Sequence, residues 1–336
     1  MNMQNFKIIT LLFILVSNLL VNVAKADDTM LTEKPYFTLR IETKNTLYLA
    51  KVNGVVVFDD NSNGNMLIAE KPVNYYMQTG LNTISFELFP KREDEFDSAN
   101  ITLSLYVNKD EAPESEKKLI SSINFNGKYY KKGNAIKLSM PEVKLDSKNN
   151  FKKSNDGDVI VDKAKLKPGV IMPGTIIISQ SFSLATPFPK WGFLDGESID
   201  FPLSYSEYTE QMDLWDGKVV NHLYEEYNKI YKLLSERDLD KVMNLFKERN
   251  EEYDIAMYYS KGTYDKKLRK ALSSDLDKYT LKLRSIDQAI PYISDDKKLL
   301  KLGNVGMIYF VNDEETSFTN YEILFYKKDG KWVISR

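Results

Sequence analysis

The sequence predicts a two-domain chain in which an all-β sandwich precedes an α+β domain, and two observations predict this. From about Tyr36 to Met140, apolar residues alternate with polar ones, which is the period of half-buried strands. Beyond about Asp213 the apolar residues recur every 3.6 positions, as on one face of a helix, and strand patterns return only near the C-terminus. A chain of 336 residues is long enough for two domains of ordinary size.

The first 26 residues differ from the rest and predict a signal peptide (residues 1–26). Lys7 is the only charge before an apolar run from Ile8 to Val21, and the small-residue pattern Ala24–Ala26 follows. A positive start, a short apolar segment and an A-x-A site are the three parts of a secretory signal, so we expect cleavage after Ala26. An uncleaved anchor is the alternative, but the run is shorter than the roughly 20 residues of a spanning helix. We therefore expect a mature chain without a transmembrane segment, either periplasmic or secreted.

Residues 27–212 are predicted to form the β-sandwich. Asn53-Gly54 lies between two β-branched runs and predicts a tight hairpin, because both turn positions require positive φ. Further alternating runs follow as far as Val107, and short strands separated by turn residues are typical of a sandwich. Residues 146–158 are rich in Lys, Asn and Asp, which predicts a long surface loop.

Residues 213–336 are predicted to form an α+β domain of three helices and an antiparallel sheet. Asp238 is the expected N-cap of the second helix, and Thr263 that of the third. The sheet is expected to end in a hairpin with a tight turn at Asp329-Gly330. The expected helices lie at about 220–234, 239–257 and 263–278.

This second domain resembles the nuclear-transport-factor-2-like superfamily, a cone-shaped α+β fold. Residues 230–246, IYKLLSERDLDKVMNLF, are similar to the helix, charged turn and second helix with which many members open. Residues 323–334, ILFYKKDGKWVI, look like their final hairpin. The resemblance implies a pocket or a dimer face in the cone. Many members hold an Asp–His pair in that pocket and others only bind, but no such pair is matched here, so no catalytic residue is carried over.

The first domain is similar, through its turns, to jelly-roll modules of carbohydrate-active enzymes and surface proteins. Val52–Val55 matches their Asn-Gly hairpin, and Gly80–Phe86 matches a Gly-x-Asn turn that leads into a core strand. The resemblance implies a jelly-roll-like sandwich, with sugar binding as one of its uses. A turn pattern of this kind also fits any other sandwich.

The segment from Asp59 to Glu70 matches a calcium-loop pattern, D-x-[DN]-x-[DN]-G-x₅-E. Such a loop needs oxygen ligands at alternate positions, a glycine for the sharp turn and a distant carboxylate. The same residue types also gather at ordinary hairpin tips, and two of the side-chain ligands would be neutral. The candidate calcium ligands are Asp59, Asn61, Asn63, the carbonyl of Asn65, and Glu70.

Composition excludes several classes of site. The chain contains no cysteine, which removes thiol catalysis and thiolate metal sites. Of 46 basic residues the signal takes two, which leaves 44 against 48 acidic ones, so charge gives no argument for binding nucleic acid. His222 is the single histidine and is expected on the solvent side of its helix, which argues against Ser-His-Asp triads and multi-histidine zinc sites.

These features favour an exported, non-enzymatic binding protein of the bacterial envelope that recognises a protein or another envelope component. An immunity-type protein that blocks a toxin is one concrete form of it. The alternative is a hydrolase of glycans or other envelope substrates, which two carboxylates facing across a cleft, one with a raised pKa, would indicate. Trp191, with Phe188 and Phe193, is expected in an interdomain or partner-facing patch.

Overall fold

The computed structural model describes residues 34–59, 66–90, 96–139, 143–145, 151–153, 160–172, 174–303 and 306–336. Apart from the first 32 residues, the chain forms one compact unit. The predicted signal peptide lies outside the described residues. Within the described ranges, no helix is both long enough and apolar enough to cross a membrane.

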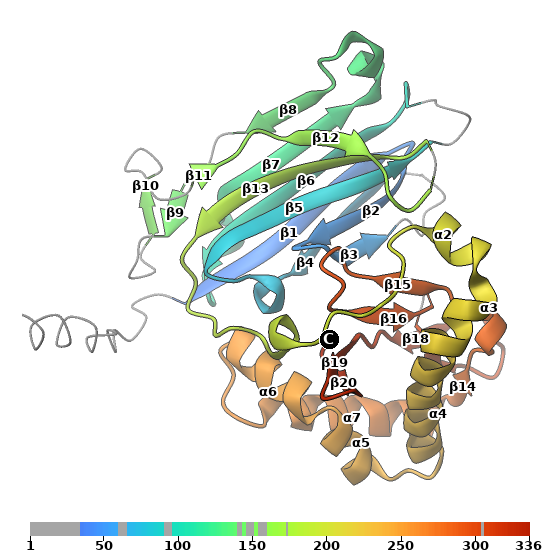
Figure 1. The fold of residues 1–336 in the computed structure, drawn as a ribbon. Helices are drawn as coiled ribbons and strands as arrows, with labels where there is room; N and C mark the ends of the chain where they lie inside the picture. The colour runs from blue at the N-terminus through green and yellow to red at the C-terminus, as the bar shows by residue number, and fades with distance from the viewer. Residues whose placement is uncertain are drawn as a thin grey trace, which may run out of the picture. The chain divides into compact units, whose positions relative to one another are not determined.

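Two antiparallel sheets form the N-terminal part of this unit (Figure 1). The first has the order β4-β1-β6-β7-β8, and the second has the order β11-β13-β5-β2-β3, with β12 also paired to β13. The strands of the first sheet are β1 (Pro35–Lys44), β4 (Leu67–Pro72), β6 (Asn100–Lys109), β7 (Lys118–Asn126) and β8 (Ile136–Ser139). Those of the second are β2 (Leu47–Val52), β3 (Val55–Asp59), β5 (Gly80–Phe89), β11 (Ile160–Val161), β12 (Lys165–Pro168) and β13 (Ile176–Leu184).

The inward faces of the two sheets share one apolar core, as in a sandwich. Buried and half-buried residues alternate along the whole of β13, which is the pattern expected of a strand with one face inside. Of the segment 146–158, the structure describes only 151–153, which is β10 (Phe151–Lys153) paired with β9 (Val143–Leu145). A β-rich part followed by a part that holds most of the helices is therefore confirmed.

The predicted Asn53-Gly54 hairpin is confirmed, since β2 and β3 pair on either side of it. Asn53 has φ 49° and Gly54 has φ 78°, as this tight turn requires. The Asp329-Gly330 turn has the same character, with φ 51° and 71°. The two turns differ in their surroundings: a Cβ on Gly54 would lie 2.8 Å from the Cβ of Asp295, whereas a Cβ on Gly330 would meet nothing within 4 Å.

We expect Gly54→Ala to destabilise the protein more than Gly330→Ala. Both changes place a side chain in the left-handed region, which costs about 1–2 kcal/mol, but only the first also pushes Asp295 away. Equilibrium denaturation of the two variants measures the difference. Equal losses would mean that the packing of Asp295 on this turn adds nothing to stability.

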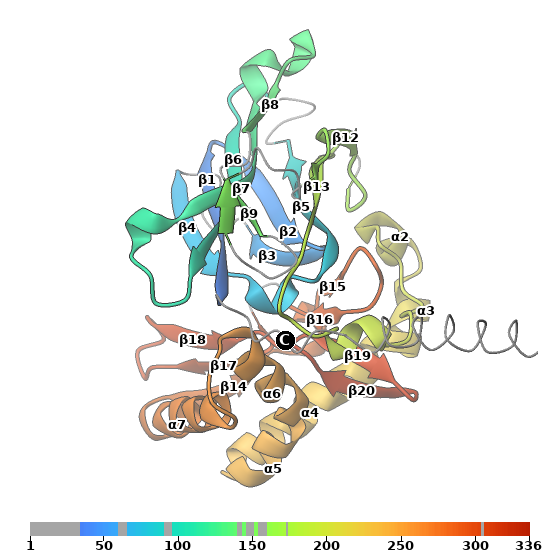
Figure 2. The ribbon, with the colours of Figure 1, turned by 90° about the vertical axis from the view of Figure 1, so that its left-hand side faces the viewer.

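The described C-terminal part contains six α-helices, where three were predicted, and a π-helical turn at Asp216–Val220 joins the second to the third of them. They are α2 (Tyr205–Glu210), α3 (Met212–Trp215), α4 (Asn221–Ser235), α5 (Leu239–Leu245), α6 (Lys247–Ala256) and α7 (Thr263–Lys278). Two sheets accompany them, with the orders β14-β17-β18 and β15-β16-β19-β20. Their strands are β14 (Thr280–Leu283), β15 (Pro291–Ile293), β16 (Leu300–Leu302), β17 (Ile308–Val311), β18 (Phe318–Tyr321), β19 (Phe325–Lys328) and β20 (Lys331–Ile334). In Figure 2 these strands lie between the sandwich and helices α5 and α7.

Besides α2 and α3, which were not predicted, two further details of the helices differ from the prediction, and one agrees with it. Asp238 does cap α5, since its carboxylate accepts from the amide of Lys241 at 3.1 Å. The predicted second helix is divided at Phe246, because the apolar stripe stops there and α6 buries mainly polar side chains. Thr263 as the N-cap of α7 was wrong: Gly262, with φ 79°, precedes the helix, and the carboxylate of Asp254 accepts from the early amide of Tyr264 at 2.7 Å.

Polar and aromatic contacts join the C-terminal part to the sandwich. The side-chain amide of Asn74 accepts a hydrogen bond from the backbone N–H of Phe37 at 2.6 Å and donates one to the backbone carbonyl of Ala256 at 2.7 Å. Trp191 is fully buried in the sandwich core, and its indole donates to the carbonyl of Met77 at 2.8 Å. Trp191 is therefore not exposed to a partner, and the guanidinium group of Arg336, from the C-terminal part, lies over its ring at 5.3 Å, which agrees with the predicted interdomain position.

Candidate functional site

The candidate site is a pocket of about 670 Å³ on the outer face of the second sheet. The outer face of a sandwich is ordinarily polar and solvated. Here it carries Leu49, Val56 and Ile177, and the remaining walls come from elsewhere in the chain. Those walls are residues 167–172, 201–205 and 290–293. The lining is predominantly apolar and aromatic, and a volume of this size suits a small-molecule ligand or an inserted chain segment.

Strand register places a row of polar residues across the pocket floor. Lys51 on β2 lies opposite Ser85 on β5, which lies opposite Ser179 on β13. Ser179 in turn lies opposite Lys165 on β12. Directly opposed residues of neighbouring strands share one face of a sheet. Lys165 is not among the residues that line the pocket, so we call the other three, Lys51, Ser85 and Ser179, the Lys51 row.

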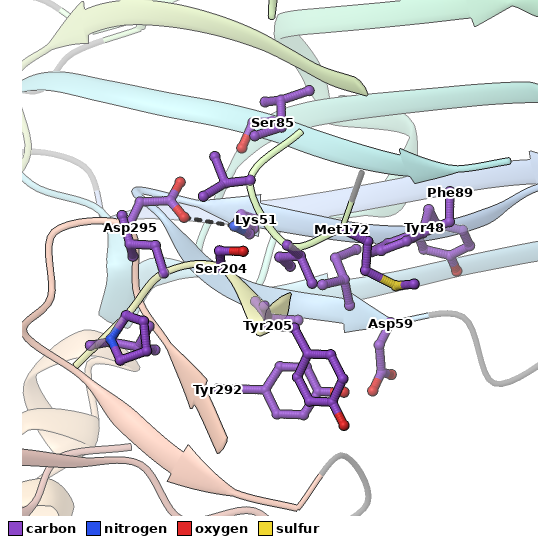
Figure 3. Close-up of a pocket in the computed structure, with 18 of the residues that line it drawn as sticks. Tyr48, Lys51, Asp59, Ser85, Phe89, Met172, Ser204, Tyr205, Tyr292 and Asp295 are labelled. Atoms are coloured by element: carbon purple, nitrogen blue, oxygen red, sulfur yellow. Dashed lines mark hydrogen bonds and ion pairs between the residues drawn. The ribbon is translucent and has the colours of Figure 1, made fainter. Parts of the chain in front are cut away.

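The polar and aromatic linings lie toward opposite ends of the pocket (Figure 3). Lys51, Asp295 and Ser204 lie together toward one end, with Ser85 on the strand above them. Toward the other end are Tyr48, Phe89 and Met172, with Tyr205, Tyr292 and Asp59 below them. A ligand that fills the pocket would therefore meet a polar group at one end and aromatic rings at the other.

Lys51 and Asp295 form an ion pair at the polar end. Lys51 Nζ lies 2.6 Å from Asp295 Oδ1, and the lysine side chain is 7% exposed whereas the aspartate side chain is 52% exposed. Asp295 is positioned through its backbone, whose amide donates to the carbonyl of Gly54 at 3.2 Å. The pair neutralises the lysine charge without burying the carboxylate completely.

Tyr205, Tyr292 and Asp59 provide the titratable groups at the aromatic end. Burial raises the pKa of Tyr292 to about 12, with further contributions from the charges of Asp59 and Tyr205. Burial also raises the pKa of Asp59, although the nearby ammonium group of Lys301 opposes that shift. The Tyr292 phenol therefore stays neutral near pH 7 and acts as a hydrogen-bonding group on an apolar wall.

The raised pKa of Asp59 gives a prediction about stability and pH. An acid with a higher pKa in the folded chain holds its proton more tightly there, so its ionised form lowers stability above that pKa. The penalty disappears as the pH falls below the unfolded value of about 3.9. We therefore expect Asp59→Asn to unfold at a higher denaturant concentration than wild type at pH 7, and this advantage to shrink on acidification. Equilibrium denaturation of both proteins in a chelating buffer from pH 4 to pH 7 measures this difference. A variant that is less stable than the wild type at every pH would contradict the prediction.

A buried carboxylate holds one wall of the pocket in place. Glu87 is 1% exposed, and its Oε1 accepts from the amides of Val170 and Ile171 at 3.0 Å each. The Thr175 hydroxyl lies 2.9 Å from the same oxygen. Because Glu87 is on β5, these bonds attach Val170, Ile171 and Thr175 to the sheet that forms the floor.

The predicted calcium ligands are only partly described. Asn61, Asn63 and Asn65 lie outside the described residues. Asp59 lines the pocket at the end of β3, and the carboxylate of Glu70, on β4, contacts the ammonium group of Lys117. Among the residues that the structure describes, no three His, Cys, Asp or Glu side chains are grouped closely enough to hold a metal ion. Calcium binding by this segment stays a prediction.

Sequence reasoning did not select the residues that line the pocket, Asp59 apart. One signal was present: Leu47–Val52, LYLAKV, lacks the alternation of a strand with one wet face. All but its first residue are buried, because the C-terminal part covers the outer face of β2. His222 is exposed, as predicted.

Comparisons of the chain with family models, with curated proteins and with solved structures find no match.

Proposed function

We propose that this chain is an exported, non-enzymatic binding protein that holds an apolar ligand, or an apolar segment of an envelope partner, in the pocket. The observation that carries this proposal is a predominantly apolar cavity of about 670 Å³ whose buried lysine already has a carboxylate partner. Pockets of this composition bind through apolar contact, while a few polar groups fix orientation. The predicted signal peptide supports a periplasmic or secreted location.

The rim of the pocket supports binding of a hydrophobic partner. Val170, Met172, Tyr205 and Ile290 line the pocket, yet each is more than a third exposed. Large apolar side chains gathered around one opening are typical of surfaces that a ligand or partner covers. Methionine and tyrosine adapt well to such contacts, because methionine is flexible and tyrosine is amphipathic.

The chemistry at the polar end also favours binding over covalent catalysis. A serine nucleophile needs a base within hydrogen-bond reach. In the described structure Lys51 hydrogen-bonds Asp295, and no hydrogen bond joins it to Ser85, its neighbour on β5. The lysine is therefore engaged as half of an ion pair.

A pocket-filling variant tests the proposal. Ser179→Phe places a ring on the floor, whereas Ser183→Phe makes the same change further along the same strand and face, outside the pocket lining. We expect Ser179→Phe to weaken binding of the neutral fluorescent probe N-phenyl-1-naphthylamine at least about tenfold, and Ser183→Phe to leave it unchanged. Pull-downs from envelope extracts with the same pair would extend the test to a macromolecular partner. Equal probe binding by both variants would overturn the proposal.

A hydrolase with a carboxylate pair is a second candidate, and one observation favours it. Asp59 and Asp295 line the same pocket, and the pKa of Asp59 is raised by burial. A carboxyl group whose pKa is raised by its surroundings is the kind of general acid that glycoside hydrolysis uses. Release of soluble sugar from envelope glycans by the wild type, and its loss in both Asp59→Asn and Asp295→Asn, would establish the hydrolase. No release by the wild type would remove it.

Calcium binding by the 59–70 segment is a further proposal, supported by its spacing and oxygen-bearing side chains. A cation that binds only the folded chain raises its melting temperature by mass action. We expect millimolar calcium to raise the melting temperature of the mature protein and a chelator to reverse the change. An unchanged melting temperature would dispose of the site.

The finer fold assignments are proposals as well. The order of helices followed by strands, and the final β19–β20 hairpin, support a nuclear-transport-factor-2-like C-terminal part. The two antiparallel sheets support a jelly-roll-like sandwich before it. An experimental structure of the mature chain would test both assignments through the strand connections.

A further inference from the structure

The Lys51 row offers unused hydrogen-bond donors inside an apolar pocket. Ser85 is 5% exposed and lines the pocket floor, and Ser179 lies beside it on the next strand. Within the described part of the chain, the hydroxyl of neither serine has a hydrogen-bond partner, whereas nearby Thr83 is bonded to Ser181 at 3.1 Å. A polar group left without a partner in such a place costs free energy unless a ligand or water satisfies it. The row is therefore suited to a ligand with oxygen acceptors.

The present ion-pair partner of Lys51 shows which kind of acceptor group fits beside its ammonium group. Asp295 presents a carboxylate to Lys51 Nζ at 2.6 Å, so the space beside this ammonium group accommodates a carboxylate. Two lysines line the pocket, but Lys167 is exposed and only Lys51 is buried, so the buried end of the pocket offers one positive charge to one negative charge. A charge-assisted hydrogen bond of this kind is stronger than a neutral one.

Asp295 has the features of a counter-ion that can be displaced. Its side chain is about half exposed, whereas Lys51 is buried. Its backbone is held independently, through the carbonyl of Gly54, so the side chain can turn to solvent while the chain stays in place. Exchange of Asp295 for a ligand carboxylate keeps Lys51 paired, which avoids the cost of an isolated buried charge.

We propose that the pocket selects a single-chain amphiphile with a carboxylate head, in which the head replaces Asp295 on Lys51 and accepts hydrogen bonds from Ser85 and Ser179. The apolar tail then lies along Phe89 and Met172 toward the aromatic end (Figure 3). This inference rests on the proposed binding function and names its ligand class. A carboxylate at the end of a peptide shares the head chemistry but lacks the continuous apolar tail.

Three probes with the same ten-carbon tail test the head: decanoate, decanol and decylamine. Their affinities are measured by displacement of N-phenyl-1-naphthylamine from the full mature chain. We expect decanoate to bind at least about tenfold more tightly than decanol, and decylamine to bind most weakly. Lys51→Met should remove the advantage of decanoate over decanol, whereas Lys165→Met, which changes an exposed lysine outside the pocket lining, should preserve it.

The variant Asp295→Asn tests whether Asp295 competes with the ligand head. If Asp295 had only a structural role, the change would not raise the affinity for decanoate. Removing the competing carboxylate should raise the affinity for decanoate several-fold, and leave that for decanol unchanged. It also leaves Lys51 without its ion-pair partner, so decanoate should raise the melting temperature of this variant more than that of the wild type. This measurement decides the case even if Lys51→Met does not fold.

The outcomes separate this inference from the proposed function. If decanol binds as tightly as decanoate, or Asp295→Asn gains no affinity for decanoate, the carboxylate head is wrong. The apolar pocket then still stands, provided that Ser179→Phe blocks the probe. If Ser179→Phe binds the probe as the wild type does, the pocket itself is not the binding site and both proposals fall. If a peptide with a free C-terminal carboxylate outcompetes decanoate, the single-chain amphiphile is overturned.

Discussion

Replacing Trp191 with alanine is expected to lower the free energy of unfolding by about 3–5 kcal/mol, the range for a large aromatic side chain removed from a core. Trp191 has no exposed surface, and its ring lies 5.6 Å from that of Phe188. Its indole satisfies the carbonyl of Met77, and the guanidinium group of Arg336 lies over its ring at 5.3 Å. The change would leave a cavity, an unsatisfied carbonyl and an uncovered cation at once. Equilibrium denaturation, monitored by far-ultraviolet circular dichroism, measures the loss.

Trp332 provides the matched control for this prediction. It lies on β20 and is only partly buried, beside the exposed end of the final hairpin. Trp332→Ala removes the same kind of side chain, but from a partly exposed position. We therefore expect it to lower the free energy of unfolding by less than half as much as Trp191→Ala does. If the two variants were equally stable, Trp191 would not be the main link between the sandwich and the segment that follows it.

Local chemistry explains why the two tight turns could be predicted. Asn53-Gly54 and Asp329-Gly330 both require positive φ at successive residues, and few residue pairs tolerate this. The cap at Asp238 could also be predicted, because its carboxylate caps the helix that begins at the next residue. In each case the residues that determine the structure are neighbours in the sequence.

The pocket could not be predicted in the same way, because its residues meet only through tertiary packing. Lys51 and Asp295 are 244 positions apart, and neither is unusual in its own segment. The strand that holds Tyr292, β15, has three residues and gives no periodic signal. Only the unalternating run at Leu47–Val52 indicated that something covers the outer face of β2, and it did not indicate what.

The division of the second predicted helix at Phe246 has a related cause. Apolar periodicity predicted one helix, but α6 buries Arg249, Asn250 and Asp254 in place of apolar side chains. Arg249 lies against aromatic rings, with its guanidinium group 4.6 Å from the ring centre of Tyr253. Tyr253 in turn stacks on Tyr75 of the sandwich at 4.6 Å. A pattern that counts only apolar residues therefore does not show where an apolar helix ends and a helix held by a cation, aromatic rings and amides begins.

Breaking the buried ion pair between Arg336 and Glu252 is expected to cost as much as losing Trp191. The two side chains are 1% and 13% exposed, and Arg336 also donates to the carbonyl of Tyr75 at 2.8 Å. Glu252 also accepts from the amide of Gly192 at 2.6 Å, so it joins α6 to the segment that carries Trp191. Arg336→Met should lower the free energy of unfolding by about 3–5 kcal/mol, because it leaves Glu252 charged and without its cation.

A double-mutant cycle separates the ion pair from the packing of the arginine side chain. Glu252→Gln keeps an acceptor for Gly192 and removes the charge, so the double variant should lose clearly less than the sum of the two single losses. The exposed pair Lys190–Asp195 is the control, and Lys190→Met should cost less than about 1 kcal/mol. Additive losses at Arg336 and Glu252 would mean that the contacts of Arg336 with Tyr75 and Trp191, and not its charge partner, hold the C-terminal strand against the sandwich.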